Sequence, residues 1–172
     1  MLNWVENRKS KLRFLYRGMR RALTDVERAS LSEVLASNVV SLLGHALRGF
    51  VVGCYRPMDC EISLTFDSYD LGCDLVYPDV VGMHFVSSES GCKKMPDVCF
   101  VPLVAFDANC MRLGLGKGWY DRMIDRYPGC LYIGVGYHFQ LHEPFLPVCG
   151  NDKLLHFVIT DKYFYSGLPF SS

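Results

Sequence analysis

One stretch of the chain combines alternating glycines with a lysine, directly before a segment with helical periodicity. Gly114, Gly116 and Gly118 alternate with other residues, and Lys117 lies between the last two. Alternating glycines leave backbone N–H groups free to face an anion, because no Cβ atom blocks the approach. A helix that begins here adds the positive end of its dipole, and the lysine adds a full charge. The pattern indicates a phosphate-binding loop, although the spacing is neither a P-loop nor G-x-G-x-x-G.

Charged residues on either side of these glycines favour phosphate binding over a purely structural tight turn. Arg112 precedes the loop, and Asp121 follows it by about one helical turn. A carboxylate beside a triphosphate requires a cation between the two, and Mg²⁺ is the usual one. Asp152 is a second loop carboxylate, but an isolated loop acid is more often a turn residue or a cap.

Basic residues are concentrated at the start of the chain. Residues 1–21 hold seven lysines and arginines and a single acid, Glu6. Residues 4–22 are predicted to form a helix with an apolar face of Val5, Leu12, Leu15, Met19 and Leu23. An adjacent stripe of the same helix is basic and consists of Lys9, Arg13, Arg17 and Arg20. From spacing alone, a solvated flank is the more common role of such a stripe, and a phosphate grip is the alternative.

Composition limits the class of protein. The chain has 172 residues, 18 basic and 18 acidic side chains, and a net charge of zero. This length predicts one domain spanning residues 1–172, and the charge balance argues against nucleic acid or an anionic membrane as the main partner. Eight cysteines lack any C-x-x-C pair and no signal peptide is recognisable, so a cytoplasmic protein with reduced thiols is expected.

Strand and helix patterns alternate along the chain. Helices are predicted over residues 4–22, 25–47, 61–69 and 117–127. Within residues 25–47 the predicted inward positions are Leu31, Val34, Leu35, Asn38, Val39 and Leu42. Strands are predicted over residues 50–55, 74–77, 83–86, 98–106, 131–136 and 156–160. Several of these strands are uniformly apolar, which predicts an α/β fold with a largely parallel, helix-covered sheet.

Five segments together resemble the 5-formyltetrahydrofolate cyclo-ligase family, and the resemblance covers nearly the whole chain. The most specific is Pro96-Asp-Val-Cys-Phe-Val-Pro-Leu-Val-Ala-Phe-Asp107 followed by Arg112-Leu-Gly-Leu-Gly-Lys-Gly-Trp-Tyr-Asp121. The others are Lys9-Ser-Lys-Leu-Arg13 with its continuation to Arg28, Tyr55-Arg-Pro-Met-Asp-Cys-Glu61, Ile133-Gly-Val-Gly with Gln140, and Asn151-Asp152 leading to Asp161. The resemblance implies a single three-layer α/β/α domain and a monomeric enzyme.

The resemblance also implies a role for each matched residue. Lys9 and Arg13 would contact ATP, and Asp121 and Asp152 would serve a Mg²⁺ site. Arg56 and Glu61 would bind the folate, Glu61 as acceptor for the N–H donors of the pterin. The triphosphate would be wrapped by Arg112, Leu113, Gly114, Leu115, Gly116, Lys117, Gly118, Trp119 and Tyr120, of which Leu115 to Trp119 would also border the folate. Lys117 and Arg112 would be the residues acting on the transferred phosphate.

The implied reaction closes the ring of 5-formyltetrahydrofolate, with or without a polyglutamate tail, to 5,10-methenyltetrahydrofolate. ATP phosphorylates the formyl oxygen, and the resulting iminium phosphate is displaced by N10. Residues 86–95 are shorter here than is usual in the family, and a G-I-x-E-P-like stretch beside the folate is missing. One alternative is therefore a nucleotide-binding member without ligase activity, which binds a folate-like ligand. A second alternative is a zinc hydrolase using His138, His142 and Glu143, although these lack the H-E-x-x-H spacing.

Overall fold

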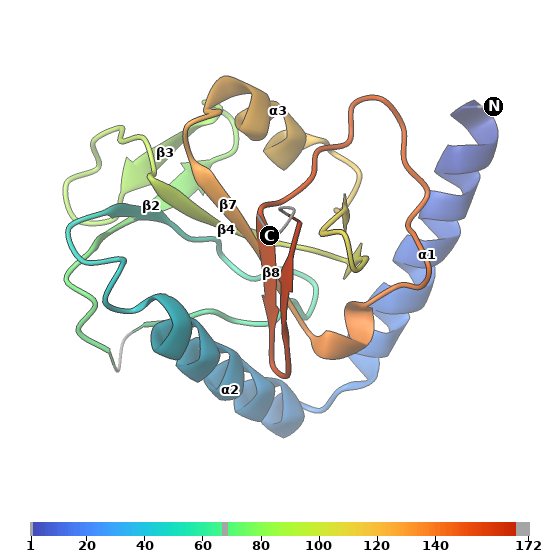
Figure 1. Ribbon diagram of the computed structural model, residues 1–172, viewed down its shortest axis with the longest axis horizontal. Coiled ribbons are helices and arrows are strands. Elements are labelled where there is room, and N and C mark those ends of the chain that lie inside the picture. Colours follow the sequence, from blue (N-terminus) through green and yellow to red (C-terminus); the bar gives the residue numbers. More distant parts are fainter. Residues whose placement is uncertain (1, 67–68, 168–172) are drawn as a thin grey trace, which may run out of the picture.

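A seven-strand sheet forms the centre of the computed structural model, which describes residues 2–66 and 69–167 (Figure 1). The strand order is β3-β2-β1-β4-β7-β8-β9. The five inner strands are parallel, and β3 and β9 run antiparallel at the two edges. The strands are β1 (Val51–Gly53), β2 (Asp74–Asp79), β3 (His84–Ser87), β4 (Val98–Pro102), β7 (Leu131–Gly136), β8 (Phe157–Thr160) and β9 (Phe164–Ser166). A separate two-strand ribbon joins β5 (Ala105–Phe106) and β6 (Arg112–Leu113).

Helices cover both faces of this sheet. The side chains of β4 alternate between the faces: Phe100 packs in the core beneath α2 (Asp25–Leu43), whereas Cys99 and Val101 pack in the core beneath α3 (Trp119–Arg126). Figure 1 shows α2 and α3 on opposite sides of the sheet. Since both faces are covered, the inner strands read as continuous apolar runs. The predicted α/β fold with a largely parallel sheet is confirmed.

Helix α2 begins and ends at recognisable signals. Thr24 and Glu27 form the capping box, and the backbone N–H of Gly44 donates to a carbonyl of the last turn. The helix therefore ends four residues earlier than predicted. Leu35 and Val39 are buried as expected, but the predicted inward residues Val34 and Leu42 are 42% and 54% exposed. Only a narrow stripe of the helix contacts the sheet, and the side chains on its far side face solvent.

Helix α1 (Leu2–Ala22) is rotated from its predicted orientation, although Leu12 and Leu23 of the predicted apolar face do pack against core clusters. Leu15 and Met19 are exposed, whereas Lys9, Tyr16 and Arg20 are buried. The reason is position: α1 does not lie on a face of the sheet but beside the loops that leave it, to the right in Figure 1, and those loops present carbonyls and carboxylates. Despite the exposed apolar side chains, no helix within residues 2–66 and 69–167 is long and apolar enough to cross a membrane.

Residues 61–69 do not form the predicted helix. Residues 61–66 and 69 have no regular secondary structure, and residues 67–68 lie outside the described residues. Alternate side chains are buried, which is the pattern of an extended chain: Ile62, Leu64 and Phe66. The Ser63 amide donates to the side-chain hydroxyl of Ser32 in α2 over 3.0 Å. A hydrogen bond to a side chain therefore satisfies this amide in place of a helical backbone bond. The apolar spacing of this short segment is compatible with both a helical and a strand period. Packing against α2 determines which of the two conformations forms.

Candidate active site

The candidate residues gather at the carboxyl edge of the parallel strands. β1, β4 and β7 all end at this edge, and the chain leaves them through residues 54–60, 103–118 and 137–156. Helix α1 packs against these segments, since Tyr16 shares a small apolar cluster with Val104, Ala105 and Leu146. Ligands of open α/β sheets bind in the crevice outside this edge. The fold therefore brings the N-terminal basic stripe and the glycine loop to the usual place for a binding site.

The glycine loop has the backbone that its glycines predict, and α1 contacts it directly. Gly116 and Gly118 have φ of +98° and +61°, a region that L side chains rarely adopt. A Cβ atom at Gly116 would lie 3.2 Å from the guanidinium carbon of Arg13. Arg13 also donates from Nε to the Gly114 carbonyl over 2.9 Å. Two predicted phosphate-binding elements that are about a hundred residues apart in sequence are thus in contact.

Asp107 holds the turn that precedes this loop, and it was not predicted to have a role of its own. It is 2% exposed, and its Oδ1 accepts hydrogen bonds from the amides of Asn109 and Met111 at 3.0 and 3.1 Å. Its Oδ2 accepts from the Leu146 amide at 3.0 Å. The signal was present, because Asp-x-Asn after a strand is typical of a turn in which the carboxylate bonds the following amides.

Lys117 is the most accessible cation of the loop. Its side chain is exposed, and among the residues that the structure describes it forms no ion pair. Its carbonyl accepts from the Arg122 guanidinium over 3.0 Å, which fixes the backbone and leaves the amine unengaged. A flexible ammonium of this kind suits the terminal phosphate of a nucleotide, as a point charge.

Arg112 and Trp119 carry unpaired buried donors. Arg112 pairs with Asp121 over 3.1 Å, and its guanidinium carbon lies 5.5 Å from the centre of the Tyr120 ring. In the described part of the chain, neither the Nε of Arg112 nor the Nε1 of Trp119 has a hydrogen-bond partner. Buried donors without a partner are rare in native proteins. Both are suited to an acceptor group on a ligand.

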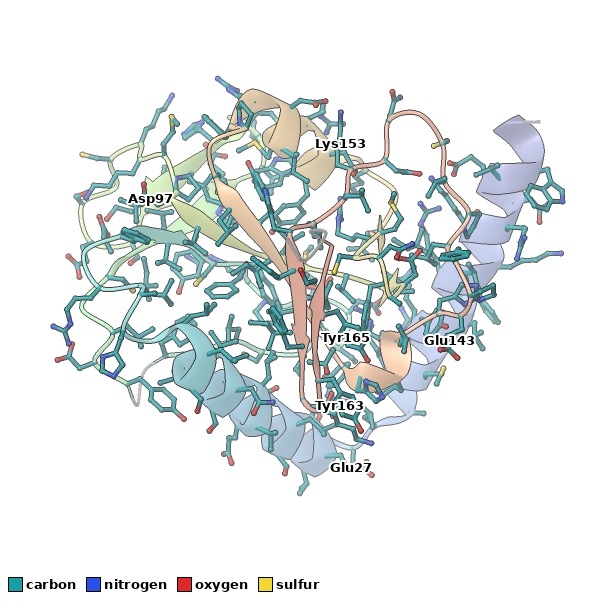
Figure 2. The ribbon with its side chains drawn as sticks, in the orientation of Figure 1. Glu27, Asp97, Glu143, Lys153, Tyr163 and Tyr165 are labelled. Carbon is teal, nitrogen blue, oxygen red and sulfur yellow. The ribbon has the colours of Figure 1, made fainter. Side chains whose placement is uncertain are left out.

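The two predicted metal ligands come close together, but each is engaged by a cation. The Lys153 amide donates to Asp121 over 3.4 Å, which brings the loop that contains Asp152 beside α3; Lys153 is labelled in Figure 2. Asp152 accepts from the Lys9 amine at 2.5 Å and from the Cys149 amide at 2.7 Å. Among the described residues no group of three or more His, Cys, Asp or Glu could hold a metal. Two carboxylates nevertheless match the hard oxygen ligands of a Mg²⁺ ion that also binds phosphates and water.

Hydrogen bonds keep the Lys9–Asp152 pair ionised although it is partly buried. Burial disfavours the charged amine of Lys9, which is 3% exposed, but hydrogen bonds to Asp152 and Cys149 outweigh it and raise the Lys9 pKa. Burial also acts against the carboxylate of Asp152, yet the hydrogen bonds from Lys9 and the Cys149 amide lower its pKa. Both shifts favour the ionised pair. The basic stripe of α1 is therefore turned inward and is not a solvated flank.

The predicted folate residues lie just after β1. Glu61 is 7% exposed, and its Oε2 accepts from the Met58 amide over 3.0 Å. Burial raises the Glu61 pKa, and this exceeds the opposing effects of the Met58 amide and Arg20. Arg56 is exposed and stacks on Tyr77 of β2, with the guanidinium carbon 4.8 Å from the ring centre. The sheet places both near its carboxyl edge.

The zinc alternative is not supported, because the two histidines have different partners. His138 Nδ1 lies 3.2 Å from the Tyr165 hydroxyl, and His142 Nδ1 lies 3.1 Å from the Tyr16 hydroxyl. Figure 2 labels Tyr165 on the last hairpin and Glu143 on the segment nearer to α1. Within the described residues these side chains form no cluster of metal ligands.

The sheet and its edge define an α/β protein with a glycine loop and the buried Glu61 at the carboxyl ends of its parallel strands. Residues 84–161 match the family described as 5-formyltetrahydrofolate cyclo-ligase. A solved 5,10-methenyltetrahydrofolate synthetase from Aquifex aeolicus is 31% identical, with a TM-score of 0.78 and 95% of each chain covered. The one from Mycoplasma pneumoniae is 25% identical, with a TM-score of 0.80, covering 90% of this chain and 99% of that one. The chain belongs to the 5-formyltetrahydrofolate cyclo-ligase family.

Curated relatives agree with this assignment. The 5-formyltetrahydrofolate cyclo-ligase of Mycoplasma pneumoniae is 28% identical over 142 residues, which is 77% of this chain and 87% of the relative. That of Mycoplasma genitalium is 28% identical over 145 residues, or 78% and 88% of the two chains. The region matched by the family model, residues 84–161, contains the glycine loop, α3 and β8, and so includes the part of the candidate site that follows β4. The family is one of ATP-dependent ligases with a folate substrate.

Proposed function

We propose that this protein uses ATP to convert 5-formyltetrahydrofolate to 5,10-methenyltetrahydrofolate, with release of ADP and phosphate. The observation that carries the proposal is the contact between Arg13 of α1 and the left-handed glycine loop at the carboxyl edge of the sheet. Family membership supports the choice of substrate. The proposed enzyme is a single domain that acts as a monomer in the cytoplasm.

The nucleotide would be bound by cations that form ion pairs with nearby carboxylates in the structure. Lys9 and Arg112 each pair with a carboxylate, Asp152 and Asp121 respectively. Phosphate oxygens would take over the two cations, and the two carboxylates would then be free to hold Mg²⁺. When bound, Mg²⁺ supplies charge neutralisation between the phosphates. Lys117, with no competing ion pair, would reach the γ-phosphate.

The folate would lie between β1 and the start of α3. Glu61 would accept hydrogen bonds from the pterin N–H groups, and the unpaired Nε1 of Trp119 would donate to a ligand acceptor. Residues 115–119 would border both ligands, because the glycine loop leads directly into α3. Exposed Arg56 would meet a carboxylate of the glutamate tail.

The reaction depends mainly on the alignment of the two substrates, and no side chain is assigned as a general base. The formyl oxygen attacks the γ-phosphorus, ADP leaves, and the product is an N5-iminium phosphate. N10 then attacks the formyl carbon, its proton passes to the departing phosphate, the carbon–oxygen bond breaks, and inorganic phosphate leaves as the ring closes. A formamide is a poor electrophile with a poor leaving group, and phosphorylation corrects both defects. Alignment of the two ligands and stabilisation of the phosphate charge by Lys117 and Arg112 are the contributions expected of the protein.

The short connection between β3 and β4 favours the second candidate, a nucleotide-binding relative without ligase activity. Lys94 pairs with Asp74 at the start of β2. This is the amino end of the parallel strands, whereas Glu61 lies beyond their carboxyl ends. This lysine therefore does not stand in for the folate-binding stretch that the short connection lacks. The two candidates differ in whether 5-formyltetrahydrofolate stimulates ATP hydrolysis.

An absorbance assay for the methenyl product tests the proposal. The wild-type protein with 5-formyltetrahydrofolate and Mg-ATP should form product, and omission of ATP should abolish it. The Lys117→Ala variant should lose about 100-fold in kcat/KM, since it removes a charge from the transferred phosphate. Lys93→Ala is the matched control, because this exposed lysine lies on the β3–β4 connection away from the loop. ATP binding without product formation in the wild type would favour the non-ligase candidate.

A further inference from the structure

Three arginines of α1 converge on one carboxylate after β1. Asp59 has φ of +50° and accepts hydrogen bonds from Arg17, from Arg20 at 3.3 Å and from Arg21 at 2.8 Å. Burial acts to raise the pKa of Asp59, but the bonds from Arg17 and Arg21 lower it. Two partly exposed arginines already neutralise this acid. The third arginine is therefore not needed for that purpose.

Arg20 differs from its two neighbours because it is completely buried and reaches further. It is 0% exposed, and its Nη1 lies 3.8 Å from Oε1 of Glu61. The same nitrogen donates to the Leu103 carbonyl over 3.4 Å, while its Nε has no hydrogen-bond partner among the described residues. A guanidinium buried with an incomplete set of partners is costly to the fold. Its position suggests that the charge serves Glu61.

We propose that Arg20 is a positioning residue that holds the Glu61 carboxylate charged and in place for the N–H donors of the substrate. This inference rests on the proposed function, in which Glu61 receives the folate. Arg20 acts through Glu61 and does not itself touch the substrate. It also ties the end of α1 to the folate side of the site, while Lys9 and Arg13 of the same helix serve the nucleotide side.

The groups that face Glu61 come from three parts of the chain: α1, the segment after β1, and α3. Arg20 on α1 is the cation recorded at Glu61 in the described residues, and Asp59 on its own loop is a like charge. Tyr55 after β1 and Tyr120 on α3 also face it, and burial raises the pKa of both, so they stay neutral at physiological pH. Removing Arg20 would leave the hydrogen bond from the Met58 amide to favour the charged form, while burial and Asp59 favour the neutral acid.

The direct test is the titration of the Glu61 carboxyl carbon by ¹³C NMR. The resonance is assigned by its disappearance in Glu61→Gln. In Arg20→Met the pKa of Glu61 should rise by about one unit, since a nearby cation is lost. Arg21→Met is the matched control, because Arg21 shares Asp59 but is largely exposed and makes no contact with Glu61. Equal Glu61 pKa values in wild type and Arg20→Met would overturn the inference.

Asp59→Asn gives a second test if Arg20→Met does not fold. Asparagine tolerates the positive φ at this position. The substitution removes the like charge at Glu61 and leaves Arg20 in place, so the Glu61 pKa should fall. A rise or no change would contradict this arrangement of charges.

The link to the substrate is tested by the pH profile of kcat/KM for 5-formyltetrahydrofolate. The acid limb should move to higher pH in Arg20→Met, stay in place in Arg21→Met, and disappear in Glu61→Gln. An unmoved limb beside a raised Glu61 pKa would mean that Arg20 does not act on the substrate, which would overturn the positioning role. Absence of product in the wild type would instead reject the proposed function, and the NMR titration would still decide whether Arg20 controls Glu61.

Discussion

Helices α1 and α2 are nearly equal in length but bury opposite kinds of side chain. α2 has 19 residues and buries Leu35, Ala36 and Val39 against one face of the sheet. α1 has 21 residues and buries Lys9 and Arg20, while outward-facing Phe14 is 85% exposed. Residues at three- and four-residue spacing share a face in both helices, yet in α1 the polar face turns inward.

The difference separates a helix that packs on a face of the sheet from one that packs beside the candidate site. A helix on a sheet face meets apolar side chains and contributes to the core. A helix beside the carboxyl ends of strands meets carbonyls and acids, and buried charges there seldom stabilise a fold more than apolar residues would. The charges of α1 are therefore best explained by ligand binding. Substitutions should separate the two helices, with α2 variants losing stability and α1 variants losing activity.

The largest loss of stability is expected for Leu35→Ala in α2. Leu35 is 0% exposed, so its truncation should lower the free energy of unfolding by about 2–5 kcal/mol. Urea denaturation measures this. Leu42→Ala on the same helix is the matched control, because Leu42 is 54% exposed and should cost much less. Activity per folded molecule should be unchanged in both variants. A loss of kcat in Leu35→Ala would contradict the expectation that α2 contributes to stability and not to activity.

Lys9→Ala should cost less stability but more activity. It leaves Asp152 partly buried without its cation, at a cost of about 1–3 kcal/mol, less than for a fully buried pair because the Asp152 side chain is 19% exposed. The KM for ATP should rise about 10-fold or more, since the phosphates then meet one cation fewer. Exposed Lys11→Ala is the control and should change neither quantity.

A double variant sharpens this prediction. Lys9→Ala combined with Asp152→Asn removes both charges, so most of the lost stability should return while ATP binding stays weak. Recovery of ATP binding in the double variant would contradict a direct role for Lys9. It would show instead that the single variant acted only through the unpaired carboxylate.

Local signals in the sequence were enough to predict the glycine loop. The left-handed φ values of Gly116 and Gly118 follow from residue type, and the strand before the loop is a continuous apolar run. Both depend on neighbouring residues alone. The assignment of Lys9 and Arg13 to the nucleotide came from family resemblance, and the structure adds their contacts with Asp152 and Gly114.

Long-range partners explain what the sequence did not reveal. Periodicity identifies the residues that share a face of α1, but not which face is buried. That choice depends on Asp152 and on Asp59, which are 143 and 39 positions away from the Lys9 and Arg20 that contact them. Arg20 was assigned to a basic stripe without a specific function for the same reason. The helix predicted over residues 61–69 was wrong because the contact of Ser63 with α2 has no local signature in the sequence.

The Lys9–Asp152 pair should make stability depend on acid pH. The lowered pKa of Asp152 gives stability that is present above its ordinary value and is lost as pH falls through the lowered one. The difference in unfolding free energy between wild type and Lys9→Ala should therefore shrink as pH falls below 3.8, the ordinary pKa of an aspartate. Urea titrations at several pH values measure it. A difference that stays constant would indicate that packing of the lysine stem, and not the ion pair, carries the cost.

The smallest effect is expected on the outer face of α1. Phe14→Ser should change the free energy of unfolding by no more than about 0.5 kcal/mol, because the exposed ring packs against little else. Tyr16→Ser on the same helix is the buried counterpart, with 6% exposure and a hydroxyl that donates to the Leu141 carbonyl over 3.2 Å, and should cost several times more. Measurement at two protein concentrations adds a second criterion. A Phe14→Ser loss of stability that grows with protein concentration would mean that a second copy covers this face, and the expected monomer would then be wrong.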